Sequence, residues 1–378
     1  MRGTMRGRYV IAGVGHTEFG KLGLDSVTLN AMACGTALRD AGIDKDLVDG
    51  LFLKVPTSAA KEILYGQKVA EAVGLQPRWG GAWDQGGAAN ITLINMAMMA
   101  IETGQCEVAL VSYADNPRSG TRQAYGRPRG NDAPYGWFAT AAGYAMIHRR
   151  HVGEFGTPEA AFGAVALAAR KHGMQNPAAQ LRKEISLDEY LASPWVVEPL
   201  RRDDCCLVSD GGAAVVVMSA AKARELQVDK PVPILGIAGA QTSYDLPLRE
   251  TLTSTEAARS GAAAFSMAGL TPSQVDVAQI YDCFTVTVLM TLEDYGFCPK
   301  GRVAEFVNDG QIEIGGRLPL NTSGGLLSET GMPGMQLVIE AVRQVRGTAR
   351  LQVPHANVSL VSNQGGTMHT HSTLILGT

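Results

Sequence analysis

The chain has 378 residues, more than one hydrophobic core usually holds, so we expect more than one lobe. Hydrophobic residues make up 46% and charged residues 18%, which is typical of a globular protein with large buried sheets. The formal net charge of -3 argues against a protein that binds nucleic acids or anionic membrane surfaces. No uninterrupted apolar run reaches the length of a membrane span. The six cysteines form no paired framework, so we expect a reducing, cytoplasmic location.

Predicted strands and helices alternate along the chain. The first part contains strands at Tyr9–Val14 and Val108–Ser112 and helices at Thr28–Ala41 and Asn90–Glu102. The pattern then changes: a loop rich in Arg, Gly and Pro precedes helical runs at Phe138–His151 and Pro158–His172, which indicates an inserted segment. Gly211–Met218 returns to the character of a buried strand. This alternation favours α/β layers over a purely β fold.

One supersecondary unit occurs twice. The helix end at 41–43 is followed by Val48-Asp49 and an apolar stretch, and 268–270 with Val275-Asp276 repeat that arrangement. Two further echoes in the same order pair 107–112 with 357–362 and 85–87 with 323–325. Chance similarity of short apolar runs is the alternative, but three echoes in one order favour an internal duplication.

Four motifs point to a family. They are 200–214 (LRRDDCCLVSDGGAA), 281–285 (YDCFT), 321–329 (NTSGGLLSE) and the closing pair Gly365-Gly366. In this order, and over essentially the whole chain, they resemble the thiolase superfamily. Within it they are similar to the sterol-carrier branch, including lipid-transfer-protein-like members linked to steroid side-chain degradation.

The resemblance implies a thiolase fold, a five-layered α/β/α/β/α body built from two duplicated halves with an inserted loop domain. We place the N-terminal half at 1–115 and 204–228, the loop domain at 116–203 and the C-terminal half at 229–378.

The usual catalytic residues of this family are missing. A thiolase carries its nucleophilic cysteine where a loop meets a helix N-terminus, which stabilises the thiolate. That position falls here on Gly87, or on Gly86 with one residue of slip. Gly331 or Met332 stands where the activating histidine is expected, and Asn363 where the second cysteine is expected. The acyl-enzyme mechanism therefore lacks its nucleophile and both proton handlers.

A retro-aldol reaction remains compatible with the residues that are present. The steroid side-chain aldolases of this superfamily carry Tyr-Asp where this chain has Tyr281-Asp282, but they have a second tyrosine at Gly331 and a histidine at Cys283. Cleavage of a β-hydroxyacyl-CoA needs a base at the hydroxyl and donors for the enolate, and no covalent nucleophile. We expect Tyr281 to transfer the hydroxyl proton and Cys283 to act as acid/base at the α-carbon. A half-buried structural tyrosine and a core cysteine are the alternatives.

Further candidates surround these two residues. Asp282, His369 and His371 could form a proton relay, and the two histidines would share one face of an extended segment. Their spacing also suits a metal, but no clear third ligand accompanies them, so we expect none. Backbone N–H groups of Gly86, Gly87, Gly365 and Gly366 are candidates for the oxyanion site. Glu329 could aid proton transfer from its loop, but a charge at a helix N-terminus is the simpler account, and we expect that. Four other cysteines are expected to be packing residues: Cys34, Cys106, Cys205 and Cys206.

The resemblance also suggests where coenzyme A would bind. Coenzyme A would enter as part of the substrate, and we expect no covalently bound cofactor. The basic loop with Arg118 and Arg122 could meet its phosphates, although a solvated or subunit-facing surface is an equal alternative. Val208 and Ser209 lie in the stretch that resembles the lining of the pantetheine channel.

We expect an acyl-CoA carbon-carbon lyase that forms a homodimer. A small zinc-ribbon/OB-fold acyl-CoA-binding partner could complete a heterotetramer, as in lipid-transfer-like members without the usual cysteines. One alternative is a thiolase or acyltransferase that uses Cys283. Another is a catalytically silent subunit that supports a partner.

Overall fold

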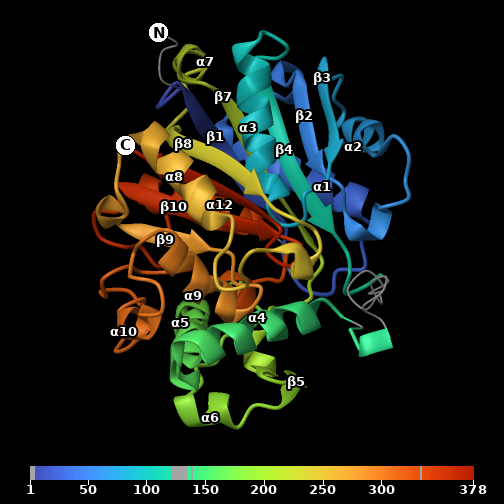
Figure 1. Cartoon of the computed structure of the whole chain (residues 1–378). Helices are drawn as coiled ribbons and strands as arrows, with labels where there is room; N and C mark the ends of the chain where they lie inside the picture. Colours follow the sequence, from blue (N-terminus) through green and yellow to red (C-terminus); the bar gives the residue numbers. More distant parts are fainter. Residues whose placement is uncertain (1–4, 121–133, 138, 333) are drawn as a thin grey trace.

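The structure is a computed structural model that describes residues 5–120, 134–137, 139–332 and 334–378 (Figure 1). Within these residues, strands form a continuous sheet in the order β3-β2-β4-β7-β1-β8-β11-β10-β9. The first half contributes β1 (Tyr9–His16), β2 (Gly50–Lys54), β3 (Trp79–Trp83), β4 (Val108–Asp115) and β7 (Gly211–Ser219). β2 runs parallel to β3 and β4, whereas β7 runs antiparallel to β4 and β1.

The second half repeats this topology. β9 (Val277–Ile280), β10 (Val358–Gly365), β11 (Thr370–Gly377) and β8 (Val232–Gln241) follow the order of β2, β4, β7 and β1. β9 is parallel to β10, and β11 is antiparallel to β10 and β8. The two strand groups join through a short antiparallel contact between β1 and β8. The shared order and direction confirm the predicted duplication.

Helices form three layers around the two strand groups. α1 (Ser26–Ala41) packs on β1, β7 and β4, and α8 (Ala257–Ala268) packs on β8 and β11. α3 (Ala89–Glu102) and α12 (Met335–Arg346) each contact strands of both groups and form the central layer. The expected five-layered α/β/α/β/α arrangement is therefore confirmed. The shorter helices are α2 (Tyr65–Val73), α7 (Ala220–Glu225), α9 (Thr285–Asp294), α10 (Val303–Val307) and α11 (Gly325–Ser328).

Local sequence signals define the ends of these helices. Asp25 caps α1 by accepting a 2.7 Å hydrogen bond from the Thr28 N–H. Gly42 ends α1 with φ of 67°, a left-handed conformation that costs glycine little. One of the three echoes is misplaced: Gly87 lies just before α3, whereas Gly325 begins α11, well ahead of α12, because an extra short helix intervenes.

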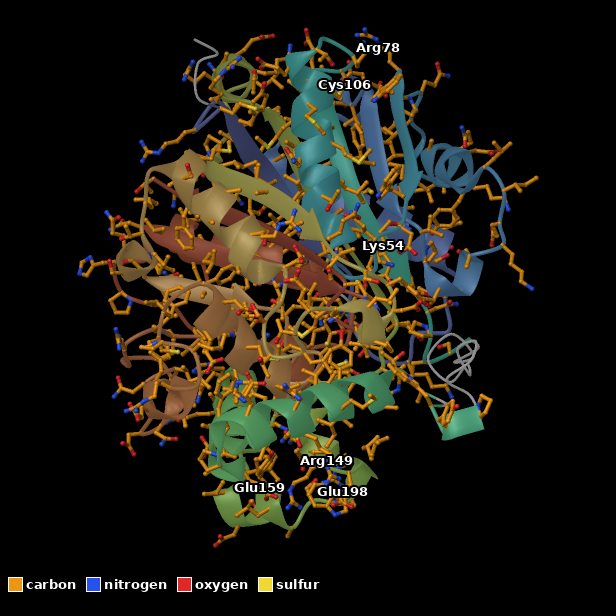
Figure 2. All side chains as sticks on the ribbon, viewed as in Figure 1. Lys54, Arg78, Cys106, Arg149, Glu159 and Glu198 are labelled. Atoms are coloured by element: carbon orange, nitrogen blue, oxygen red, sulfur yellow. The ribbon has the colours of Figure 1, made fainter. Side chains whose placement is uncertain are left out.

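The segment between β4 and β7 lies outside the main sheet. It contains α4 (Thr140–Phe155), α5 (Glu159–Gln175), α6 (Leu187–Leu191) and a two-stranded pair, β5 (Trp195–Val197) and β6 (Leu200–Arg201). These elements form the lower end of the molecule, where Figure 2 labels Arg149, Glu159 and Glu198. The exact domain boundaries remain predictions. Among the described residues, the helices are too short or too polar to cross a bilayer.

Candidate active site

Three separate segments meet at the predicted catalytic position. Gly86 and Gly87 precede α3, Tyr281 follows β9, and Gly365 ends β10. A Cβ atom placed on Gly87 would lie 2.6 Å from the Tyr281 hydroxyl oxygen and 2.4 Å from the Gln364 carbonyl oxygen. A Cβ atom on Gly86 would lie 2.7 Å from the Gly365 Cα. The structure therefore brings these predicted residues together, and the Tyr281 ring fills the space in front of Gly87.

A buried lysine supports the Gly86 turn. The Gly86 N–H donates a 3.0 Å hydrogen bond to Asp84 Oδ1. Lys54 Nζ lies 3.7 Å from the same oxygen, with its side chain 5% exposed, and 4.3 Å from the centre of the Tyr113 ring. Burial lowers the pKa of Lys54, whereas the Asp84 carboxylate raises it. Because its N–H is engaged by Asp84, Gly86 is less suited to the predicted oxyanion role.

Cys283 lies in a buried polar cluster that the sequence did not suggest. Gln364 Nε2 donates to Cys283 Sγ at 2.9 Å and to the Tyr144 hydroxyl oxygen at 2.8 Å. The Tyr144 hydroxyl donates to the Gly366 carbonyl at 2.5 Å, and its ring stacks on Phe284. Burial is the main reason that the Cys283 pKa is raised well above its usual value. The only sequence signal for Gln364 was its place directly before the closing glycines.

The contacts of Asp282 indicate a structural role. It is fully buried and accepts N–H groups of Leu326 at 2.8 Å and Leu327 at 3.3 Å, in the first turn of α11. Burial raises its pKa to about 6. With both oxygens used by backbone donors, Asp282 anchors the loop before α12, and the contacts described do not join it to Tyr281 in a relay.

Glu329 was expected at a helix N-terminus, and this expectation is wrong. It follows the last residue of the short helix α11 instead. Its carboxylate is buried and accepts hydrogen bonds from Ser323 Oγ at 2.6 Å and Asn176 Nδ2 at 3.1 Å. Burial raises its pKa to about 7. The carboxylate therefore links the end of α5 to the loop before α11.

The structure does not bring His369 and His371 together as a pair. His369 lies in the turn before β11, where Arg249 contacts its Nδ1 and Tyr244 stacks on its ring. A Cβ atom on Gly366 would come within 2.1 Å of the His369 Cδ2. His371 lies in β11, with Nε2 2.7 Å from Ser362 Oγ, and burial lowers its pKa to about 3. The two histidine side chains contact different groups, and none of the contacts described joins them.

Tyr295 completes the surroundings of His371. Its hydroxyl lies 3.3 Å from the His371 Nε2, and it belongs to the segment that caps α9. The His369 side chain therefore lies beside Gly366, whereas the His371 side chain contacts Ser362 and Tyr295.

The predicted coenzyme A contacts meet through one glutamine. Arg118 Nη1 donates to Gln180 Oε1 at 2.9 Å, and Gln180 Nε2 donates to Ser209 Oγ at 2.6 Å. Ser209 is buried and also accepts the Gly331 N–H at 3.1 Å, whereas Val208 is partly exposed. Arg122 lies outside the described residues.

No acid or base stands at the two other family positions. A Cβ atom on Gly331 would lie 1.5 Å from the Leu207 carbonyl oxygen, so the neighbouring backbone occupies the space of a side chain there. Asn363 is buried, and its Nδ2 donates to the Gly87 carbonyl at 3.3 Å. Met332 is also buried. Among the other cysteines, Cys34 and Cys106 are buried as expected, but Cys205 and Cys206 are partly exposed. The described residues contain no cluster of three metal-ligating side chains.

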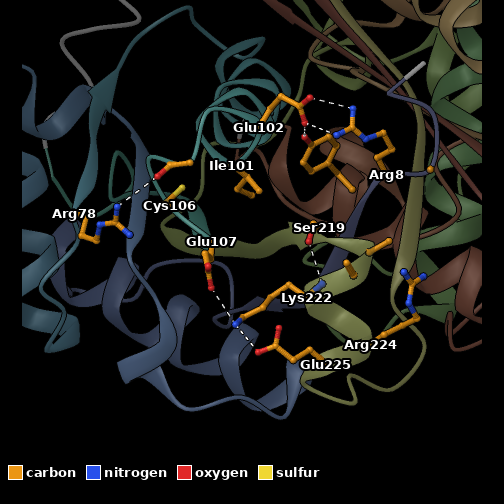
Figure 3. Close-up of a pocket in the computed structure, with 15 residues that line it drawn as sticks. Arg8, Arg78, Ile101, Glu102, Cys106, Glu107, Ser219, Lys222, Arg224 and Glu225 are labelled. Atoms are coloured by element: carbon orange, nitrogen blue, oxygen red, sulfur yellow. Dashed lines mark hydrogen bonds and ion pairs between the residues drawn. The ribbon is translucent and has the colours of Figure 1, made fainter. Parts of the chain in front are cut away.

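A hollow of about 720 Å³ lies at the other end of α3 (Figure 3). α3 begins beside Gly87, and Glu102 at its end lines the hollow, so roughly 20 Å of helix separates the two places. Its carboxylates are already paired: Glu102 with Arg8, and Glu107 with Lys222. Figure 2 labels Lys54 and Cys106 toward opposite ends of the strands of the N-terminal half. The hollow is therefore separate from the candidate active site.

Comparisons with known proteins agree with this geometry. A family model described as thiolase C-terminal domain-like matches residues 238–378. The chain is 38% identical, over 99% of its length and all of the relative, to the 17-hydroxy-3-oxo-4-pregnene-20-carboxyl-CoA lyase of Mycobacterium tuberculosis. It is 37% identical to a steroid side-chain-cleaving aldolase of Thermomonospora curvata, with 98% of each chain covered.

A solved structure gives the same result. The structure described as the Ltp2-ChsH2(DUF35) aldolase superposes with a TM-score of 0.89 at 36% identity, over 99% of this chain and 98% of that one. The chain therefore belongs to the thiolase superfamily, and within it to the branch of acyl-CoA lyases and steroid side-chain-cleaving aldolases.

Proposed function

We propose that this chain cleaves a β-hydroxyacyl-CoA by a retro-aldol reaction without a covalent acyl-enzyme. One observation carries the proposal: the Tyr281 hydroxyl stands 2.6 Å from where a Gly87 Cβ would be, so a phenol takes the place of the nucleophile. A retro-aldol reaction needs a group that takes the hydroxyl proton and hydrogen-bond donors for the enolate oxygen. Neither requires a covalent bond between the enzyme and the substrate.

The substrate class follows from the relatives. The name of the Mycobacterium tuberculosis lyase places a hydroxyl on carbon 17 and a thioester-bearing carboxyl on carbon 20, an arrangement in which the hydroxyl is β to the thioester. Cleavage of the bond between the α- and β-carbons then yields a ketone and a shorter acyl-CoA. We propose a β-hydroxyacyl-CoA with a steroid or aromatic side chain as the substrate of this chain.

In the proposed mechanism, Tyr281 takes the hydroxyl proton and Cys283 returns a proton to the α-carbon. Both side chains are buried, with 8% of their surface exposed. A free tyrosine titrates near 10, so its action as a base near pH 7 costs about 4 kcal/mol unless the site stabilises the phenolate. His369 is our relay candidate because its ring lies beside Gly366, whereas His371 contacts Ser362 and Asp282 contacts the first turn of α11.

N–H groups of Gly87, Gly365 and Gly366 are our candidates for holding the enolate oxygen. Removal of one such donor in other enzymes costs about 10²–10³-fold in turnover. Arg118 and the segment around Val208 and Ser209 are proposed to bind the coenzyme A part, since Gln180 already links them.

We further propose a homodimer formed along β3. This strand is an edge of the sheet, and all five of its residues are exposed, including Trp79 and Trp83. An unpaired edge with exposed aromatic residues readily pairs with another strand, here that of a second copy. The related aldolase structure contains a ChsH2(DUF35) component, so we propose a comparable small zinc-ribbon/OB-fold partner and a heterotetramer for this chain as well.

The test is mass-detected turnover of a β-hydroxyacyl-CoA panel with steroid and aryl side chains. Wild type is compared with Tyr281→Phe, with any co-purifying partner present and without added coenzyme A. Tyr65→Phe is the matched control, because its buried hydroxyl accepts a 2.8 Å hydrogen bond from Asn30 on α1 and contacts none of the predicted catalytic residues in the hydrogen bonds described. Ketone and shorter acyl-CoA should form with wild type and with the control, but not with Tyr281→Phe.

Two other results would replace the proposal. A covalent acyl group on Cys283 would favour the acyltransferase. Absence of turnover with every substrate, while acyl-CoA or subunit binding persists, would favour a silent subunit.

A further inference from the structure

Gln364 joins Cys283 to a tyrosine from the inserted segment. It comes from the end of β10, Tyr144 from α4, and Cys283 from the segment between β9 and α9. Gln364 and Tyr144 are at most 2% exposed. The amide Nε2 lies 2.9 Å from Cys283 Sγ and 2.8 Å from the Tyr144 hydroxyl oxygen, so one side chain contacts both groups.

The hydrogen-bond inventory fixes the orientation of this amide. The Met368 N–H lies 3.1 Å from Oε1 and can only donate, so Oε1 must be the oxygen. The two hydrogens of Nε2 are then directed to Tyr144 and to Cys283. The Tyr144 hydroxyl has two oxygen acceptors, Gln364 Oε1 at 3.0 Å and the Gly366 carbonyl at 2.5 Å, and its proton goes to the closer one, Gly366. Sγ is consequently an acceptor, and its own S–H remains available to another group.

We propose that Tyr144 and Gln364 are positioning residues that hold the Cys283 thiol ready to protonate the α-carbon, an inference that rests on the proposed lyase function. The bond between the α- and β-carbons breaks, and its electron pair stays on the α-carbon as the thioester enolate. The S–H proton moves to that carbon, and the Gln364 N–H stabilises the thiolate left behind. The proton taken from the β-hydroxyl then returns to the sulfur, which balances the cycle.

The groups facing Cys283 explain why it needs this support. They are Tyr144 from α4, Cys205 and Cys206 from the segment before β7, and Asp282 next to it in sequence. Burial, followed by Cys206, Asp282 and Cys205, raises the Cys283 pKa, whereas the neighbouring Tyr144 hydroxyl lowers it. Loss of the Gln364 donor, or of the Tyr144 hydroxyl that accepts from the same amide, should therefore make the thiolate harder to form.

Two readouts test this role, and neither needs the natural substrate. The first is exchange of the α-hydrogens of propionyl-CoA with D₂O, followed by mass spectrometry. The second is the pH dependence of iodoacetamide alkylation at Cys283, with peptide mapping to separate it from Cys205 and Cys206. The variants are Tyr144→Phe and Gln364→Met, with Tyr65→Phe as the control for loss of a buried tyrosine hydroxyl.

Both variants should slow propionyl-CoA exchange by about tenfold or more. Both should also move Cys283 alkylation to higher pH by about one unit, which is a tenfold slower reaction at pH 9. Tyr65→Phe should match wild type in both assays. If Tyr144→Phe fails to fold, Gln364→Met carries the same test, because it removes the N–H donor and keeps a long flexible side chain.

Unchanged alkylation profiles in the folded variants would overturn the inference, as would normal exchange in Cys283→Ser. The outcomes also separate this inference from the proposed function. Cleavage by wild type with unchanged alkylation in both variants refutes the positioning role alone. Shifted alkylation and slowed exchange, without cleavage of any β-hydroxyacyl-CoA, refute the proposed function and support the positioning role.

Discussion

Gly87→Ala tests the central geometric claim with one methyl group. No left-handed φ is required at Gly87, so alanine can adopt its backbone conformation. The new Cβ would, however, lie 2.6 Å from the Tyr281 hydroxyl oxygen and 2.4 Å from the Gln364 carbonyl oxygen. Normal contacts between such atoms are about 3.5 Å, so the phenol must move by about 1 Å.

The expected magnitudes follow from that displacement. Overpacking of this kind costs about 1–3 kcal/mol of stability, since the Gln364 contact is with backbone and cannot rotate away. A displacement of about 1 Å in a catalytic group can reduce the rate by about 10²-fold. We therefore expect kcat/KM to fall at least about 100-fold, in a protein that still folds.

The assay compares turnover and urea unfolding of Gly87→Ala with those of Gly153→Ala. Gly153 lies exposed in α4, also without a left-handed φ, and its added Cβ would meet nothing within 4 Å. The control should keep full activity and gain up to about 1 kcal/mol of stability, since alanine favours a helix over glycine. A Gly87→Ala/Tyr281→Ala double variant should lose less stability than the two single changes combined, because the ring is gone. Wild-type turnover and stability in Gly87→Ala would refute the packing of Tyr281 against this glycine.

Three further predictions concern buried charges. Lys54→Met should lower kcat/KM by about tenfold, because the Asp84-Gly86 turn becomes looser. The variant should lose little stability, because the substitution removes a buried charge. A loss of thermal stability as large as the loss of turnover would contradict this prediction. His371 has a folded pKa of about 3 against about 6.5 unfolded, so the unfolded state binds the proton first and stability falls with pH below 6.5. Between pH 7 and 5 this loss is about 2 kcal/mol in urea titrations, and His371→Gln should lack it. Glu329 has a folded pKa of about 7, above its unfolded value near 4.3, so stability is lost as pH rises through that interval. Glu329→Gln can keep both hydrogen bonds and should be on the order of 3 kcal/mol more stable than wild type at pH 8; an unchanged urea midpoint there would refute it.

Local signals in the sequence were sufficient to place most elements. The predicted helix at Asn90–Glu102 is observed at Ala89–Glu102, and the strand predicted at Val108–Ser112 extends to Asp115. Periodicity and glycine helix ends depend on neighbouring residues, so they survive without knowledge of the fold. The family resemblance also predicted Gly87, or Gly86, at the position of the nucleophile.

Contacts between distant segments could not be inferred in the same way. Gln364 and Tyr144 are 220 positions apart in sequence, and no local pattern pairs an amide with a phenol at that separation. The two histidines near the C-terminus looked equivalent by spacing, but their side chains contact different partners.

By itself, the sequence determined the duplicated α/β architecture, the family resemblance and the absence of the thiolase nucleophile, because these depend on residue order and local periodicity. Only the tertiary structure decided that Tyr281 fills the space before Gly87, that Asp282 anchors α11, and that Gln364 lies between Tyr144 and Cys283. These relations arise where loops from both halves and the inserted segment pack together. Such packing depends on the whole fold, since each contact is fixed by side chains that lie far apart in the chain.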